Sequence, residues 1–215
     1  LVAKHTECAE KLSIKNEINI RRILDEYFTQ LKSDLLFVAK EKHLSSQSLD
    51  KVLSYGELLS TTIVADYLSQ FGINAEMLDA RKVILTDNYF GHAFVQYQES
   101  YNCIRSYCKD RNHIQVITGF IGSTETGETT TLGRSGSDYT AAIFGAALNA
   151  EIIEIWTDVN GILSADPKII NEAEVVPSLT YEEAMELAHA GAKVIFPPTM
   201  IPALYKNIPI VIKNT

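Results

Sequence analysis

The chain has 215 residues, of which 46% are hydrophobic and 21% are charged, a composition typical of packed globular proteins and not of disordered ones. Its formal net charge of -8 argues against a nucleic-acid-binding role, because phosphate backbones are bound by clustered Lys and Arg side chains. Uncharged runs such as residues 139–150 are shorter than the ~20 residues that cross a bilayer, so we expect no membrane association.

The first seventy residues predict two helical regions. From residue 7 to about residue 42, apolar residues recur every three or four positions, which predicts one long or broken amphipathic helix. A second helix is expected from Leu49 to Phe71, with Asp50 near its start and Gly72 as its C-terminal stop. Apolar residues cover most faces of this second helix, so we expect it to be internal.

Beyond Gly72 the pattern changes to short Val- and Ile-rich runs that alternate with helices. This alternation predicts an α/β fold, a three-layer α/β/α sandwich with a mainly parallel sheet, in which ligands bind beyond the carboxyl ends of the strands. We expect a single domain over residues 1–215, with residues 1–48 as a helical segment within it. The expected strands are 75–78, 82–85, 113–118, 151–157 and 208–212, and the expected helices are 100–110, 139–149 and 181–189.

The three cysteines, Cys8, Cys103 and Cys108, predict neither a disulfide framework nor a zinc site. Their number is odd, and the one close pair lacks a second ligand pair to complete a zinc site. No basic and apolar leader segment follows Leu1. We therefore expect reduced thiols in a cytoplasmic protein, without a metal bound by the chain itself.

Glycine is concentrated in one stretch, since residues 119–136 contain five of the eleven glycines. The stretch lacks Gly-x-Gly, a Walker A loop and Gly-x-Ser-x-Gly, so it fits none of the dinucleotide, P-loop or hydrolase motifs. It ends in "LGRSGSD" at an expected helix start, where free backbone amides and the helix dipole favour an anion. A site for a phosphate and an amino acid is one interpretation, and a mobile hairpin loop is the other.

Several motifs in order resemble the consecutive signatures of aspartate kinases, in the amino acid kinase family. They are "GFIGSTETGETTTLGRSGSDYTAA", "IWTDVNGILSADP" and "EEAMELAHAGAKVIFPPT", with "SYGELLST" before and "IPIVIKNT" after them. The resemblance spans residues 50–215, and the helical segment before it resembles the insert that these kinases carry. "TYEEAMEL" and "VIKNT" most resemble the kinase part of bifunctional aspartokinase-homoserine dehydrogenases.

The resemblance implies the amino acid kinase fold and transfer of the ATP γ-phosphoryl group to the side-chain carboxylate of L-aspartate. The product is 4-phospho-L-aspartate, on the route to threonine, lysine and methionine.

The resemblance assigns the amino-acid substrate to five residues. Arg134 matches the arginine that binds the α-carboxylate, and Glu57 matches the glutamate that receives the α-amino group. Phe120 matches a residue that lines the pocket. Ser137 and Asp138 match a pair beside substrate and phosphates, with Asp138 as the catalytic member. The ordinary alternatives are a surface arginine, a solvated glutamate, a core phenylalanine and a helix N-cap. We expect Arg134 and Glu57 to face each other across a cavity sized for a small zwitterion.

The resemblance also implies ATP and Mg²⁺ as cofactors. Thr157 and Asp158 match positions around the base and ribose of the nucleotide, although Asn160-Gly161 could instead form a tight hairpin turn. Lys193 matches a nucleotide-contacting lysine, and its alternative is a cation just beyond a helix end.

The sequence departs from the family pattern at several points. Leu163 stands where many relatives have tyrosine, Lys168 where they commonly have arginine, and Phe196 where histidine is frequent. These departures put stacking on the nucleotide and bidentate phosphate contact in doubt at Leu163 and Lys168. The Lys-Phe-Gly-Gly-Thr-Ser loop of relatives is missing, as are their regulatory domains, so the chain resembles a kinase truncated at both ends. In the full-length protein a homo-oligomer is expected.

Two alternatives to an aspartate kinase stay open. One is another amino acid kinase, acting on glutamate, acetylglutamate, carbamate or UMP. The other is a binding or assembly module that keeps the fold without the chemistry, which the missing lysine loop leaves possible.

Overall fold

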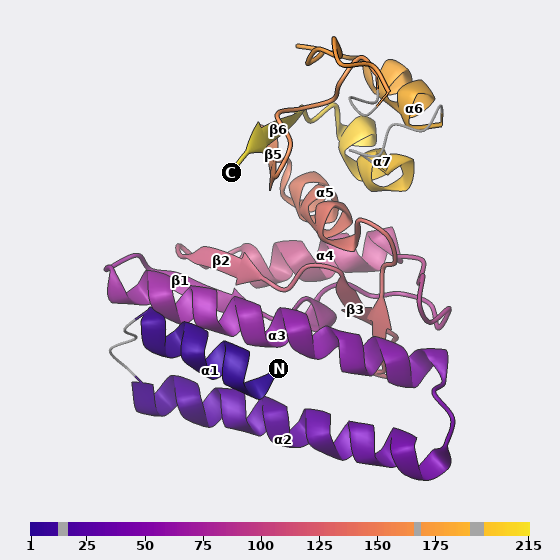
Figure 1. Ribbon diagram of the computed structural model, residues 1–215. Coiled ribbons are helices and arrows are strands. Elements are labelled where there is room, and N and C mark those ends of the chain that lie inside the picture. Colours follow the sequence, from indigo (N-terminus) through magenta and orange to yellow (C-terminus); the bar gives the residue numbers. More distant parts are fainter. Residues whose placement is uncertain (13–16, 166–168, 190–195) are drawn as a thin grey trace. The chain divides into compact units, whose positions relative to one another are not determined.

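The computed structural model describes residues 1–12, 17–165, 169–189 and 196–215 (Figure 1). Contacts along the chain divide it into two compact units, Leu1–Gly133 and Arg134–Thr215. Both units combine helices with a parallel strand pair, so the expected α/β class is confirmed. Over the described ranges, every helix falls short of the length or the hydropathy that a bilayer span requires.

The first unit begins with three helices that pack side by side. They are α1 (Val2–Lys11), α2 (Glu17–Glu41) and α3 (Ser46–Gln70), so the broken form of the expected first helix is the correct one. Figure 1 shows α1 and α2 alongside α3, with β1 and β2 beyond α3 from α2. The apolar stripe of α2 supplies a shared core, because its side chains recur at four-residue steps. This core consists of Ala9, Ile20, Leu24, Phe28, Leu59 and Ile63.

Helix α3 begins three residues earlier than the sequence pattern indicated. Ser45 is its N-cap and accepts a hydrogen bond from the Ser48 amide at 3.1 Å, whereas Asp50 is fully buried in the second turn. The expectation of an internal helix is only half right, because Leu53 and Val64 are 45% and 46% exposed. Apolar composition alone did not reveal which face of the helix meets solvent.

The parallel pair of the first unit is β1 (Ala75–Leu78) with β2 (Ile114–Ile117), and α4 (Tyr97–Cys108) lies between them in sequence. The strand expected at residues 82–85 is wrong. Its start lies in a 3₁₀ turn, η1 (Ala80–Lys82), because the Asp79 side chain accepts the Arg81 amide and turns the backbone. At its end, Leu85 makes an isolated bridge to Ser123.

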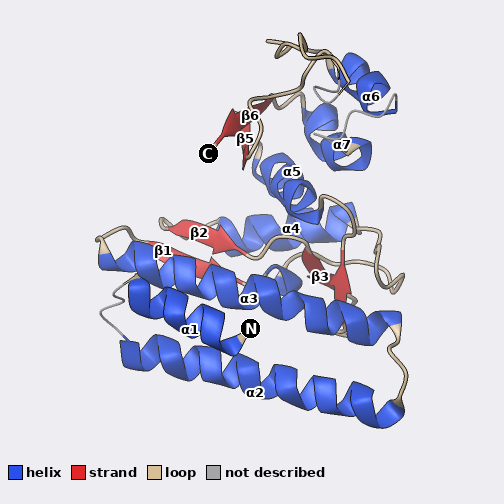
Figure 2. Cartoon of the chain, viewed as in Figure 1, coloured by secondary structure: helices blue, strands red, loops and turns tan. Residues whose placement is uncertain are grey.

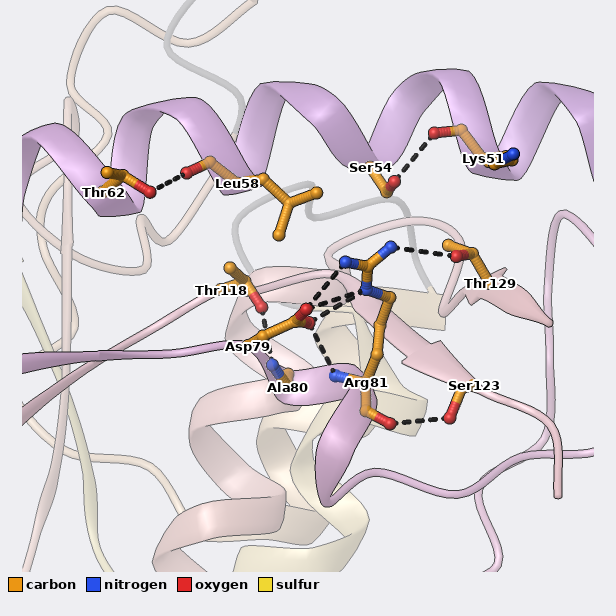
Figure 3. A network of polar contacts seen from close by, with 10 residues as sticks. All are labelled: Lys51, Ser54, Leu58, Thr62, Asp79, Ala80, Arg81, Thr118, Ser123 and Thr129. Carbon is orange, nitrogen blue, oxygen red and sulfur yellow. Dashed lines mark hydrogen bonds and ion pairs between the residues drawn. The ribbon is translucent and has the colours of Figure 1, made fainter. Parts of the chain in front are cut away.

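A half-buried ion pair holds this turn against its neighbours (Figure 3). The Arg81 guanidinium donates to Asp79 Oδ1 at 2.9 Å and to Asp79 Oδ2 at 2.7 Å, and its Nη1 donates to Thr129 Oγ1 at 3.1 Å. The Arg81 carbonyl accepts the Ser123 hydroxyl at 2.7 Å. Thr118 Oγ1 accepts the Ala80 amide at 2.8 Å, so the carboxyl ends of β1 and β2 are tied together.

The glycine-rich stretch begins as an antiparallel hairpin of β3 (Ile121–Ser123) and β4 (Thr129–Thr131). The hairpin interpretation of this stretch is therefore correct for residues 121–131, while the expected run into a helix is also correct. Gly122 in β3 allows close packing, because a Cβ there would lie 3.0 Å from both the Ile84 carbonyl oxygen and Thr86 Cγ2. These contacts explain why glycine is required within this strand.

The second unit contains α5 (Gly136–Leu148), the parallel pair β5 (Ile153–Thr157) and β6 (Ile210–Asn214), α6 (Tyr181–His189) and α7 (Pro197–Lys206). Figure 2 shows the long loop that separates β5 from α6. The sequence patterns predicted no element at α7, which contains three prolines. Prolines at the first helical positions are compatible with a helix start, because they lack only amides that have no partner there. The core of this unit includes Ala142, Ile153, Ala203 and Ile208.

We predict that Gly122→Ala destabilises the protein by about 1–3 kcal/mol, because the added methyl group meets backbone that cannot give way. The matched control is Gly56→Ala in α3, where an added Cβ would meet nothing within 4 Å. That change should stabilise the protein by roughly 0.5–1 kcal/mol through helix propensity. Urea unfolding of both variants measures the difference, and equal effects of the two changes would contradict the packing argument.

Candidate functional site

The segment that follows β2 has a strained backbone. Thr118 is fully buried, and its amide donates to the Leu78 carbonyl at 3.0 Å. Two residues later Phe120 adopts φ +70°, a left-handed conformation that is rare for a bulky side chain. The Phe120 carbonyl accepts the Leu132 amide at 2.8 Å, so the end of β4 helps to hold this conformation. Strained backbone of this kind concentrates at functional sites, where surrounding contacts enforce it.

Glu57 of α3 lies beside this strained segment. Its side chain is half-buried, and burial raises the pKa of the carboxyl group, while a hydrogen bond from the Gly119 backbone amide lowers it by less. The carboxylate is therefore incompletely compensated by the protein. A cationic ligand group would supply the missing partner. The structure thus brings Glu57 together with Gly119 and Phe120 in the first unit.

The Gly119 amide is a site feature that the sequence analysis missed. Glycine directly before Phe120 in "GFIG" marked the place, but the pattern did not reveal that a backbone amide there would meet Glu57.

The hairpin ends in a left-handed turn at Gly133, which has φ +75°. A Cβ on Gly133 would lie 2.2 Å from His92 Nδ1, so both the backbone conformation and the close approach of the imidazole require glycine. The turn lies directly before Arg134 in the sequence.

In the second unit, Arg134 and Asp138 flank the start of α5. The N-cap Ser135 has φ 53° and makes no side-chain capping bond, so the expected N-cap role of Ser137 and Asp138 is wrong. Arg134 is exposed, and its guanidinium carbon lies 5.5 Å from the centre of the Phe196 ring, a cation–π distance. Phe196, which stands where relatives often have histidine, therefore contacts the expected substrate arginine.

The two polar residues of the first turn of α5 differ in exposure. Ser137 is exposed, whereas Asp138 is half-buried, and burial raises the pKa of its carboxyl group. Helix α5 begins at Gly136, so both side chains lie at the positive end of the helix dipole.

Thr157 and Asp158 lie at the carboxyl end of β5, where the rule for parallel sheets places ligands. The Thr157 carbonyl accepts the Thr215 amide at 3.0 Å, and its hydroxyl donates to Asp158 Oδ1 at 3.3 Å. Asn160 Oδ1 accepts the Asn214 side-chain amide. These contacts hold the start of the loop against β6.

The expected tight hairpin at Asn160-Gly161 is not formed. Instead, the Val176 amide donates to the Ile162 carbonyl at 2.9 Å, and half-buried Leu163 bridges to Val175. A long-range pairing therefore replaces the local turn. Lys168 and Lys193 lie outside the residues that the structure describes.

A cavity of about 790 Å³ opens along β6 in the second unit. Its walls include residues 210–212 of β6 and residues 160–162, which lie between the candidates Asp158 and Leu163 in the sequence. None of the candidate residues in the described part of the chain lines it. The cavity therefore adjoins the loop that carries these candidates without containing one of them.

Within the described ranges, no group of three or more His, Cys, Asp or Glu side chains is arranged to hold a metal ion. Mg²⁺ in phosphoryl-transfer sites is commonly held by the substrate phosphates with only one or two carboxylates. A single carboxylate such as Asp138 at the start of α5 fits a metal that arrives with a nucleotide.

Comparison with known proteins gives a consistent result. Residues 5–214 match the model of the amino acid kinase family. Aspartokinase 1, chloroplastic, of Arabidopsis thaliana is 38% identical over 96% of this chain, which covers 39% of that protein. A bifunctional aspartokinase/homoserine dehydrogenase of Haemophilus influenzae is 35% identical over 91% of this chain, which covers 24% of it.

Among solved structures, the crystal structure of Escherichia coli aspartokinase III in complex with aspartate and ADP is similar with a TM-score of 0.89. It shares 34% identity over 96% of this chain and 46% of that chain. This chain therefore spans less than half the length of these relatives. With the family model matched over nearly its whole length and the fold shared with an aspartokinase, the chain belongs to the amino acid kinase family.

Proposed function

We propose that the protein is an aspartate kinase, which transfers the γ-phosphoryl group of ATP to the side-chain carboxylate of L-aspartate and forms 4-phospho-L-aspartate. The observation that carries this proposal is the shared fold with an aspartokinase whose complex contains aspartate and ADP. The candidate residues support it, since they offer a carboxylate for an ammonium group and a guanidinium for a carboxylate.

Recognition of aspartate is assigned to three of the candidate residues. Arg134 binds the α-carboxylate through two parallel hydrogen bonds, which a planar guanidinium provides and an ammonium group cannot. Phe196 supports this guanidinium by its cation–π contact. Glu57 accepts the α-ammonium group, which compensates a carboxylate that burial leaves short of partners. Phe120 lines the pocket, held in place by its left-handed backbone.

Phosphoryl transfer to a carboxylate needs no general base, because the nucleophile already carries a lone pair. Catalysis then consists of positioning and of neutralising the negative charge that gathers around the γ-phosphate. Backbone amides in the first turn of α5 and the Ser137 hydroxyl supply donors to phosphate oxygens. Asp138 is the carboxylate that would hold Mg²⁺, and the metal would supply positive charge that offsets the negative charge of the phosphates.

The nucleotide is assigned to the loops of the second unit. Thr157 and Asp158 contact the base and ribose from the carboxyl end of β5. Leu163 packs on the base in place of a stacking tyrosine, and Lys168 and Lys193 contact phosphates as point charges.

We extend the proposal to the protein as a whole. Residues 1–215 form one amino acid kinase catalytic domain, with residues 1–48 as a helical segment within it. The reaction is cytoplasmic, starts the route to threonine, lysine and methionine, and is carried out by a homo-oligomer.

The proposal predicts that the protein forms an acyl phosphate when it is incubated with L-aspartate, ATP and Mg²⁺. Hydroxylamine converts an acyl phosphate into a coloured hydroxamate, which measures the product directly. Glutamate, acetylglutamate, carbamate and UMP serve as competing substrates in parallel assays. Phosphorylation of one of these without phosphorylation of aspartate would overturn the proposal. Calorimetric binding of aspartate and ATP without any product would instead indicate an inert binding module.

A second prediction concerns the ionisation of Glu57. Burial raises the pKa of its carboxyl group, so the folded protein binds this proton more tightly than the unfolded chain does. Between the two pKa values the stability therefore falls as pH rises, and at neutral pH the ionised group is a net cost. Glu57→Gln should raise the Tm by about 2 °C at pH 7 while it weakens aspartate binding.

In the protein without this substitution, aspartate affinity should fall as the pH drops through the raised pKa of Glu57, because protonation removes the partner of the ammonium group. Isothermal calorimetry across pH 4–8 follows this loss. Exposed Glu99 of α4 offers the control for affinity, and Glu99→Gln should leave aspartate affinity unchanged and should not raise the Tm, because its carboxylate favours the start of the helix. A Glu57→Gln variant with unchanged affinity would remove Glu57 from the site.

A third prediction separates geometry from charge at position 134. Arg134→Lys keeps the positive charge but loses the parallel pair of hydrogen bonds, so the KM for aspartate should rise by about tenfold or more. Exposed Arg105 of α4 provides the control, and Arg105→Lys should leave the KM unchanged. An unchanged KM in Arg134→Lys would mean that the residue is an ordinary surface arginine.

A further inference from the structure

Asp50 is a fully buried carboxylate in α3 that none of the assigned roles uses. Its Oδ2 accepts the Gly91 amide at 2.8 Å and the Thr131 amide at 2.9 Å, and its Oδ1 accepts the Thr131 hydroxyl at 2.8 Å. All three partners donate, which suits a carboxylate that can only accept. One side chain thus joins α3, the loop before α4 and the last residue of β4.

Asp50 shares a helix with Glu57 and contacts the strand that precedes Arg134 in the sequence. Glu57 follows it by seven residues, which is close to two helical turns, so the two carboxylates lie on the same face of α3. Thr131 precedes Arg134 by three residues, through the left-handed turn at Gly133. Asp50 therefore fixes the position of α3, which carries Glu57, relative to β4, which precedes Arg134 in the sequence.

Two further contacts hold β4 in this position. Arg81 donates to Thr129 Oγ1 at 3.1 Å, so β4 is held at its first residue as well as at its last. On the other side, the Ala93 amide donates to the Thr131 carbonyl at 2.9 Å. Between Gly91 and Ala93, the His92 ring packs against Gly133, the residue that makes the left-handed turn.

We propose that Asp50 is a positioning residue for aspartate recognition, which holds the backbone that precedes Arg134 at a fixed place against the helix that carries Glu57. This inference rests on the proposed function. Asp50 touches neither substrate nor nucleotide in this proposal. Its effect reaches the substrate through the strand and the turn, and it should therefore appear in aspartate binding more than in nucleotide binding.

Two substitutions at position 50 distinguish the loss of the hydrogen bonds from the loss of the negative charge. In Asp50→Asn the amide oxygen can accept both backbone amides, while its NH₂ group donates to the Thr131 hydroxyl, which can also accept. Asp50→Ala loses all three bonds. Ser100→Ala is the control for burial, since Ser100 is equally buried and its hydroxyl bonds to the Leu85 backbone amide at 2.9 Å.

Steady-state kinetics should show a larger effect on the KM for aspartate than on the KM for ATP. Asp50→Ala should raise the KM for aspartate by about tenfold or more while the KM for ATP changes by less than about threefold. Asp50→Asn should stay close to the unsubstituted protein, and Ser100→Ala should lower the Tm without moving the KM for aspartate. The inference is overturned if Asp50→Ala changes both KM values equally or changes neither.

If Asp50→Ala does not fold, Thr131→Val provides the test, because it removes the hydroxyl bond to Asp50 and keeps the amide bond. It should raise the KM for aspartate by about threefold, and an unchanged value overturns the inference.

Amide hydrogen exchange tests the positioning role of Asp50 separately from the proposed kinase function. Asp50→Ala, or Thr131→Val in its place, should speed exchange at residues 131–135 more than Ser100→Ala does. If the unsubstituted protein neither binds nor phosphorylates aspartate, the proposed function fails, and the exchange rates alone decide whether Asp50 holds this segment. Equal exchange in the variant and the control would show that it does not.

Discussion

The β3–β4 hairpin depends on two paired charged side chains, fully buried Asp50 and half-buried Arg81. Asp50 accepts three hydrogen bonds at one end of β4, and Arg81, paired with Asp79, donates to Thr129 at the other. A fully buried charge that loses its partners costs several kcal/mol, so the contacts of Asp50 cannot be given up cheaply. Each strand of the hairpin has only three residues, so its backbone hydrogen bonds alone would hold it weakly. The side-chain contacts of Asp50 and Arg81 add the restraint.

The restrained hairpin lies between two segments of left-handed backbone. Phe120 precedes β3 and Gly133 follows β4, with φ values of +70° and +75°. At Phe120 this conformation persists only where surrounding contacts enforce it, whereas glycine adopts it readily. The Leu132 amide bonds to the Phe120 carbonyl, so the end of β4 is connected directly to the strained residue. Phe120 is itself one of the residues proposed to bind the substrate.

Burial raises the pKa of Glu57 and Asp138, the two carboxylates with proposed ligand roles. It also raises the pKa of Asp66 in α3, whose Oδ2 is buried without a hydrogen-bond partner among the described residues. Asp50 and Asp79, by contrast, each accept several hydrogen bonds. A raised pKa by itself therefore does not distinguish a binding carboxylate from a structural one.

Local sequence patterns determined several helices and strands of this protein, whereas other features depended on contacts that only the folded chain makes. Helix α6 and strand β1 agree with the expected ranges, because the period of apolar residues reports the face that each element buries. The ordered motifs likewise identified the family. Sequence did not reveal the 3₁₀ turn at Ala80–Lys82, the α7 helix or the buried role of Asp50. The 3₁₀ turn depends on a local side-chain contact of Asp79, α7 begins with prolines whose missing amides need no partner, and Asp50 depends on partners far along the chain. The donors that surround Asp50 lie 41 and 81 residues away, and only the folded chain brings them to it.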